Sequence, residues 1–83
     1  MDKKNLTAEE TFTLAIQNHK KNNLQVSEKL YRETLKINPN HVDAYSNLGI
    51  ILHRSGELQK AKNCYEKAIQ IQPNNASAHN NLG

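Results

Sequence analysis

Four histidines give this chain side chains that could bind a metal ion, and two of them occupy matching places in a sequence that repeats. His19 and His53 are the matching pair, and His41 and His79 are the others. A protein-bound zinc ion takes its ligands at about 2 Å. If His19 and His53 lie on neighbouring equivalent helices, roughly 8–10 Å separates the helix axes, so the two imidazoles would not converge on one ion. The sequence therefore predicts groove-lining or solvated histidines, with no metal site and no cofactor.

Cys64 is the single cysteine, and it could act as a nucleophile only if a nearby group favoured its thiolate. No arrangement of His and Asp with this residue is visible, and it takes the place that Leu30 has in the preceding copy of the repeat, which indicates an apolar, packed position. We therefore predict no catalytic residue, and a chain that is not itself an enzyme. One cysteine also excludes an internal disulfide and fits a reducing compartment, so we expect a cytoplasmic location.

Asn47 and Asn81 have side chains suited to binding a peptide main chain. Each stands directly before a Leu-Gly pair, so they occupy the same place in successive copies of the repeat. A side-chain amide both donates and accepts hydrogen bonds, so two such amides in register could pair with the N–H and C=O groups of an extended peptide. Solvated surface asparagines are an equally good interpretation of the same pattern.

The elements that position these residues repeat every 34 positions. When Ala8–His41 is laid over Val42–Asn75, the identical pairs are Leu14/Leu48, Ile16/Ile50, His19/His53, Leu24/Leu58, Gln25/Gln59, Tyr31/Tyr65, Ile37/Ile71, Pro39/Pro73 and Asn40/Asn74. Ala76–Gly83 begins a third copy. A period of this length is typical of stacked helical hairpins.

Apolar residues at three- and four-residue spacing predict two helices in each copy. The expected helices are Ala8–Lys21, Leu24–Ile37, His41–Ser55 and Leu58–Ile71. No stretch alternates with period two for long enough to indicate a strand. Small residues at Ala15/Gly49 and Ser27/Ala61 should allow paired helices to approach closely.

Residues typical of helix ends lie at the expected boundaries. Thr7 and Glu10 form the pattern of a capping box, and Asn40 and Asn74 are predicted to cap the helices that follow them. Left-handed backbone is expected at helix ends at Asn22 and Gly56, and turns at Pro39 and Pro73.

The second copy resembles the tetratricopeptide repeat. It carries, in order, the residues of that signature: Tyr45, Leu48, Gly49, Leu52, Ala61, Tyr65, Ala68 and Pro73. The resemblance implies an all-α fold, a right-handed superhelical array of antiparallel helix-turn-helix hairpins. It divides the chain into a polar lead (1–7), two full repeats (8–41 and 42–75) and the first helix of a truncated third (76–83).

The resemblance also implies where a ligand lies, because the first helices of such repeats line the concave surface. The predicted peptide-binding residues on that surface are Phe12, Ile16, Asp43, Asn47, Ile50, His53, Arg54 and Asn81. The Asn47 and Asn81 column is similar to that of O-linked N-acetylglucosamine transferases and related plant regulators. Co-chaperones of this family bind a terminal carboxylate with a basic and Asn clamp. The chain keeps only Asn47 of that clamp, so we do not expect that specialisation.

Composition limits the classes of partner. The chain has 83 residues and a formal charge of +3, and its longest apolar run is too short to span a bilayer, so we expect no membrane partner. Its short lysine pairs lack interleaved aromatics, so we expect no nucleic-acid partner. Two complete hairpins are fewer than the roughly three that a stable array needs. We therefore expect the N-terminal piece of a longer protein, or completion by association.

The sequence thus predicts a scaffold that binds a protein or extended peptide in a concave groove. Two alternatives stay open. The array could recruit substrate for a glycosyltransferase-like or other transferase domain. It could also mediate self-association through its open C-terminal end, formed by Leu58, Tyr65, Ile69 and Leu82.

Overall fold

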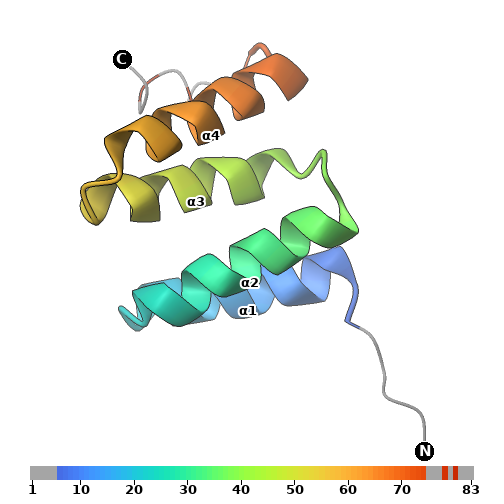
Figure 1. Ribbon diagram of the computed structural model, residues 1–83. Helices are drawn as coiled ribbons and strands as arrows, with labels where there is room; N and C mark the ends of the chain where they lie inside the picture. Colours follow the sequence, from blue (N-terminus) through green and yellow to red (C-terminus); the bar gives the residue numbers. More distant parts are fainter. Residues whose placement is uncertain (1–5, 75–77, 79, 81–83) are drawn as a thin grey trace, which may run out of the picture.

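The chain folds as two helical hairpins stacked on each other (Figure 1). The structure, a computed structural model, describes residues 6–74, 78 and 80. Within these residues the helices are α1 (Ala8–Lys20), α2 (Leu24–Ile37), α3 (Val42–Arg54) and α4 (Leu58–Ile71), and there is no strand. The predicted all-α fold is therefore confirmed. The bounds of α2 and α4 agree with those predicted, and α1 and α3 each end one residue earlier than expected.

Each hairpin is held by contacts between its own two helices, and the hairpins meet through α2 and α3. Helix α1 packs along α2, helix α3 packs along α4, and α2 packs against α3. Figure 1 shows the resulting order, with α3 lying between α2 and α4. The third predicted hairpin falls almost entirely outside the described residues. Of its first helix only Ala78 and Asn80 are described, and Ala78 is fully buried.

The predicted signals at the helix ends mostly form as expected. The Glu10 amide donates to Thr7 Oγ1 over 3.1 Å, and the Thr7 amide donates to Glu10 Oε1 over 2.9 Å, which completes the capping box. Asn22 and Gly56 adopt φ angles of 65° and 85°, the left-handed backbone expected where α1 and α3 end. Their conformation lets the chain reverse direction within each hairpin.

The predicted cap of α3 is wrong by one residue. Asn40 is the expected cap, but His41 takes this role, because its Nδ1 atom accepts a 3.1 Å hydrogen bond from the Ala44 amide. The helix consequently starts at Val42, one residue later than predicted. The Asn40 amide instead donates to Asn38 Oδ1 in the turn. The helix that Asn74 is expected to cap begins outside the described residues.

The two helices of each hairpin approach each other closely, through a glycine in the second hairpin and a serine hydrogen bond in the first. A Cβ atom on Gly49 would lie 2.5 Å from Cε1 of Tyr65, so the Tyr65 ring occupies the space that a side chain would need. In the first hairpin the Ser27 hydroxyl donates a 2.7 Å hydrogen bond to the Ala15 carbonyl. Both observations confirm the prediction that small residues allow the helices to approach.

The repeat equivalence explains which leucines are exposed. Leu48 is 2% exposed because α2 packs against α3, whereas its equivalent Leu14 on α1 is 38% exposed. Likewise Leu24 is half-buried against the core, whereas its equivalent Leu58 on α4 is 58% exposed. The same residue types are therefore covered between the hairpins and left open on the two outer helices. None of the described helices combines the length and apolar character needed to cross a membrane.

Candidate functional site

The residues predicted to bind a peptide lie on matching stripes of α1 and α3. Helical spacing places Asp43, Asn47, Ile50 and Arg54 on one stripe of α3, and the stripe through Ile16 is its counterpart on α1. We call this surface the inner face; its residues are Glu9, Phe12, Thr13, Ile16, His19 and Lys20 of α1 and Asp43, Asn47, Ile50, His53 and Arg54 of α3. Asn81, the remaining predicted residue, lies outside the described residues.

Apolar side chains form the middle of the inner face. Phe12, Ile16 and Ile50 are half-buried, and all three pack against the core cluster that contains Tyr31 and Leu48. Each therefore presents part of its surface to solvent while the rest is held in place by the core. Covering that remaining surface with a ligand would release water without the cost of ordering mobile side chains.

Three helices converge on the Tyr31 hydroxyl beside this apolar strip. His19 Nδ1 on α1 lies 3.0 Å from the Tyr31 oxygen on α2. Burial raises the pKa of the Tyr31 phenol, and the nearby polar side chains of Ser27 and Asn47 offset part of that rise. The predicted peptide-binding amide of Asn47 is thus held next to a buried hydroxyl. Sequence reasoning placed Tyr31 only in the core, although a buried tyrosine hydroxyl usually needs a polar partner.

The start of α3 is attached to α1 through His41. Its ring is 8% exposed and lies with its centroid 4.4 Å from that of Phe12. Because Nδ1 accepts from the Ala44 amide, the ring proton sits on Nε2, which donates to Glu9 Oε2 over 3.0 Å. His41 therefore holds Glu9 and Phe12 against the neighbouring hairpin. The sequence predicts a groove-lining or solvated histidine here, and the burial of His41 corrects that expectation.

The charged residues of the inner face lie near the helix ends. Asp43, His53 and Arg54 are exposed. Burial lowers the pKa of His19, and the positive charge of Arg54 lowers it further. Arg54, near the end of α3, therefore lies close enough to act on a residue near the end of α1.

Outside the inner face, the described residues show little that could bind a metal ion or catalyse a reaction. No group of three or more His, Cys, Asp or Glu residues within them is placed to hold a metal ion. Cys64 is half-buried, and burial raises the pKa of its thiol, which disfavours the reactive thiolate. It lines a shallow hollow of about 210 Å³ with Arg32, Leu52, Lys60 and Asn63.

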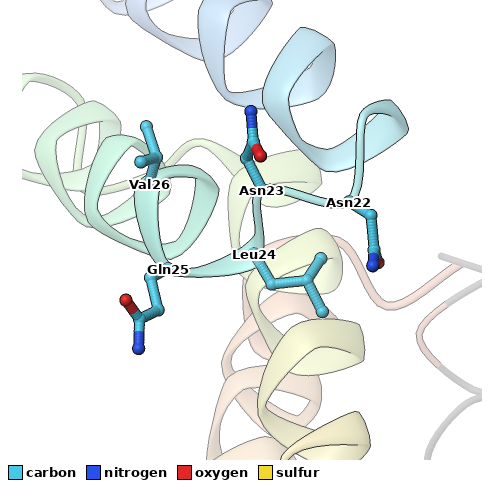
Figure 2. A pocket seen from close by; sticks show the side chains of 5 residues that line it. All are labelled: Asn22, Asn23, Leu24, Gln25 and Val26. Atoms are coloured by element: carbon cyan, nitrogen blue, oxygen red, sulfur yellow. The ribbon is translucent and has the colours of Figure 1, made fainter.

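A second hollow, of about 380 Å³, lies at the turn between α1 and α2. It is lined by the consecutive residues 22–26, and Figure 2 shows that the side chains of Asn22, Gln25 and Val26 point away from one another. A binding pocket needs a few polar groups that converge on a ligand. This hollow lacks that arrangement, so the inner face is the better candidate site.

Comparison with known proteins agrees with this architecture. Residues 42–75 match the family model of the tetratricopeptide repeat. Two solved structures, described as crystal structures of MamA and of the MamA protein, each superpose with a TM-score of 0.88 and 29% sequence identity. Each alignment covers 92% of this chain, but only 44% and 42% of the respective MamA chains, so this chain spans less than half of their length. Comparison with curated proteins finds no match.

Proposed function

We propose that this array of tetratricopeptide-type hairpins is a protein-interaction scaffold that binds an extended peptide segment of a partner across its inner face. The observation that carries the proposal is the half-buried apolar strip of Phe12, Ile16 and Ile50, which lies beside the amide of Asn47. A surface of this kind supplies apolar contact area together with a main-chain hydrogen-bonding group, the combination typical of peptide recognition.

Asn47 would contribute orientation more than affinity. Its amide can donate to a peptide carbonyl and accept from a peptide N–H. It also lies near the Tyr31 hydroxyl of the neighbouring hairpin. Asn81, at the equivalent place in the next copy of the repeat, would extend the same column along the array.

Selection from a degenerate peptide library displayed on phage tests this function. Peptides enriched on the immobilised protein are expected to lose about tenfold in affinity, or about 1.4 kcal/mol, when Ile50→Asp places a charge in the apolar strip. Val26→Asp is the matched control, because Val26 is an exposed apolar residue of α2 outside the inner face. Enrichment of no peptide, or equal losses in both variants, would overturn the proposal.

Self-association is a second candidate. Of the residues predicted to form an open C-terminal end, Leu58 is exposed and Ile69 half-buried, but Tyr65 is 4% exposed, which corrects its assignment to that surface, and Leu82 lies outside the described residues. Leu14 on α1 is exposed as well. In this arrangement α4 of one copy would pack on α1 of the next, as α2 packs on α3 within the chain. Light scattering over a dilution series tests it, and a constant monomer mass would contradict it. Recruitment of substrate for a glycosyltransferase-like or other transferase domain stays a prediction from the resemblance alone.

A further inference from the structure

Charged residues of the inner face are sorted by sign between the two ends of its helices. Glu9 lies in the first turn of α1 and Asp43 in the first turn of α3, and we call this pair the acidic rim. Lys20 and Arg54 lie in the last turns of the same helices, and we call them the basic rim. In each helix the two rims are three turns apart, which corresponds to about 16 Å along its axis.

The contacts between hairpins place like charges on the same side. Glu9 reaches His41, the residue that caps the start of α3. At the opposite ends, Arg54 of α3 acts on His19 of α1 through its charge. The starts of α1 and α3 are therefore joined through the Glu9–His41 bond, and their ends lie on the same side of the inner face. The apolar residues Ile16 and Ile50 lie between the two rims.

Compensation of the helix dipoles favours this sorting, but it is not equally complete in every helix. Acidic residues at helix starts and basic residues at helix ends are favourable in any helix. Yet α2 and α4 have no acidic residue in the first turn, and α4 has no basic residue in its last turn. Among the four helices that the structure describes, full sorting of charge is confined to α1 and α3, so the sorted charges coincide with the face that we propose binds a peptide.

We propose that the inner face recognises an extended peptide in which acidic and basic side chains alternate. Successive side chains of an extended chain point to opposite sides, so alternation sends every acidic side chain to one edge and every basic one to the other. Acidic side chains would then meet Lys20 and Arg54, and basic side chains would meet Glu9 and Asp43. The methylene stems of these long side chains would cross the apolar strip between the rims.

The acidic rim retains acceptors for such a peptide. One oxygen of Glu9 accepts from His41, but the Glu9 side chain is 77% exposed, and a carboxylate has two oxygens that can accept further bonds. Asp43 is exposed at the start of α3. Complementary charge of this kind contributes chiefly to specificity and to the rate of association. The inference rests on the proposed function and specifies the class of peptide that the inner face selects.

Three labelled peptides of about twelve residues distinguish charge pattern from net charge. In the first, Lys and Glu alternate; in the second, the same residues form two blocks; the third contains Glu alone. The alternating peptide is expected to bind about tenfold more tightly than the others at low salt, and to weaken as salt is raised. Since the protein has a formal charge of +3, attraction by net charge alone would favour the all-Glu peptide.

Variants of each rim provide the matched comparison. Asp43→Asn and Arg54→Gln should each weaken binding of the alternating peptide about three- to tenfold. Glu66→Gln and Lys67→Gln make the same charge changes at exposed positions of α4 and should leave binding unchanged. Circular dichroism checks that every variant folds.

The result that would overturn the inference is tightest binding of the all-Glu or block peptide, or no binding of the alternating one. Equal effects of the rim and α4 variants would overturn it as well. If library peptides still bind in an Ile50-dependent manner, the proposed function stands without this specificity. If no library peptide is enriched either, both fail together.

Discussion

The imidazole of His19 and the phenol of Tyr31 join the two helices of the first hairpin, with Nδ1 3.0 Å from the hydroxyl oxygen and the rings edge to face. Tyr31 is fully buried, and the Asn47 side chain of the next hairpin lies near enough to its hydroxyl to lower the pKa of the phenol. One buried oxygen of the first hairpin therefore lies beside the residue that we propose contacts the peptide.

Removal of that hydroxyl should reduce both stability and peptide binding. Tyr31→Phe keeps the ring in the core but leaves His19 without this partner, so we expect a loss of about 0.5–1.5 kcal/mol in unfolding free energy. Peptide affinity should also fall, because Asn47 loses a polar neighbour. Urea unfolding and fluorescence anisotropy measure the two effects.

The equivalent change in the second hairpin is the control. Tyr65 packs its ring against Gly49, and only burial and the Cys64 thiol affect the pKa of its phenol. Tyr65→Phe should therefore cost less stability than Tyr31→Phe and leave peptide affinity unchanged. Equal losses in the two variants would contradict the role given to the Tyr31 hydroxyl.

The stability of the fold should fall in mildly acidic solution partly through His19. Burial, and then the charge of Arg54, lower the pKa of this imidazole in the folded state, so the unfolded chain binds a proton more readily. The contribution of His19 is complete above its unfolded value of 6.5 and is lost as the pH falls from there through the lower folded value.

Unfolding measured at about pH 7.5 and about pH 5 checks the sign of this effect. His19→Asn should reduce the difference in stability between the two conditions. Gln17→Asn, a change at an exposed position of α1 that involves no ionisable group, should leave the difference intact. A pH dependence that is unaffected by His19→Asn would show that other groups cause it.

The His41 side chain should stabilise α3 as its cap. His41→Ala removes the acceptor for the Ala44 amide, and we expect a loss of about 1 kcal/mol. His41→Ser restores a capping oxygen without the bond to Glu9, so it should recover most of that loss if capping dominates. If Ser recovers nothing, the contacts of His41 with Glu9 and Phe12 would be the main contribution.

The contact between Gly49 and Tyr65 should make the second hairpin intolerant of larger residues. A methyl group at Gly49 would displace the Tyr65 ring, so Gly49→Ala should cost about 1–3 kcal/mol. In combination with Tyr65→Leu the added cost should be smaller, because the ring that clashes is gone. Strict additivity of the two losses in thermal or urea unfolding would contradict this contact.

The sequence predicts the helices well because local signals define their ends. The left-handed residues Asn22 and Gly56 precede α2 and α4, and Pro39 and Pro73 follow these helices, so the predicted bounds agree with the structure. The predicted cap of α3 is wrong because histidine is an uncommon cap, and its choice depends on Glu9, which is distant in the sequence.

The candidate site is only partly predictable from sequence. Helical spacing and the repeat place Asn47, Ile50 and Arg54 on one stripe, and the resemblance predicts which side faces a ligand. The grouping around Tyr31 is missed, because it depends on how α1, α2 and α3 converge in space. The binding role of these residues stays a prediction until a ligand is bound.

The most direct test is to map a library-selected peptide on the protein by nuclear magnetic resonance. If the inner face binds the peptide, amide shifts should be largest along one stripe of each first helix, around Ile16 on α1 and around Asn47 and Ile50 on α3. They should be small around Val26 on α2 and Glu66 on α4. Shifts concentrated on α2 and α4, with α1 and α3 unchanged, would contradict the proposal that this array binds its partner through the inner face.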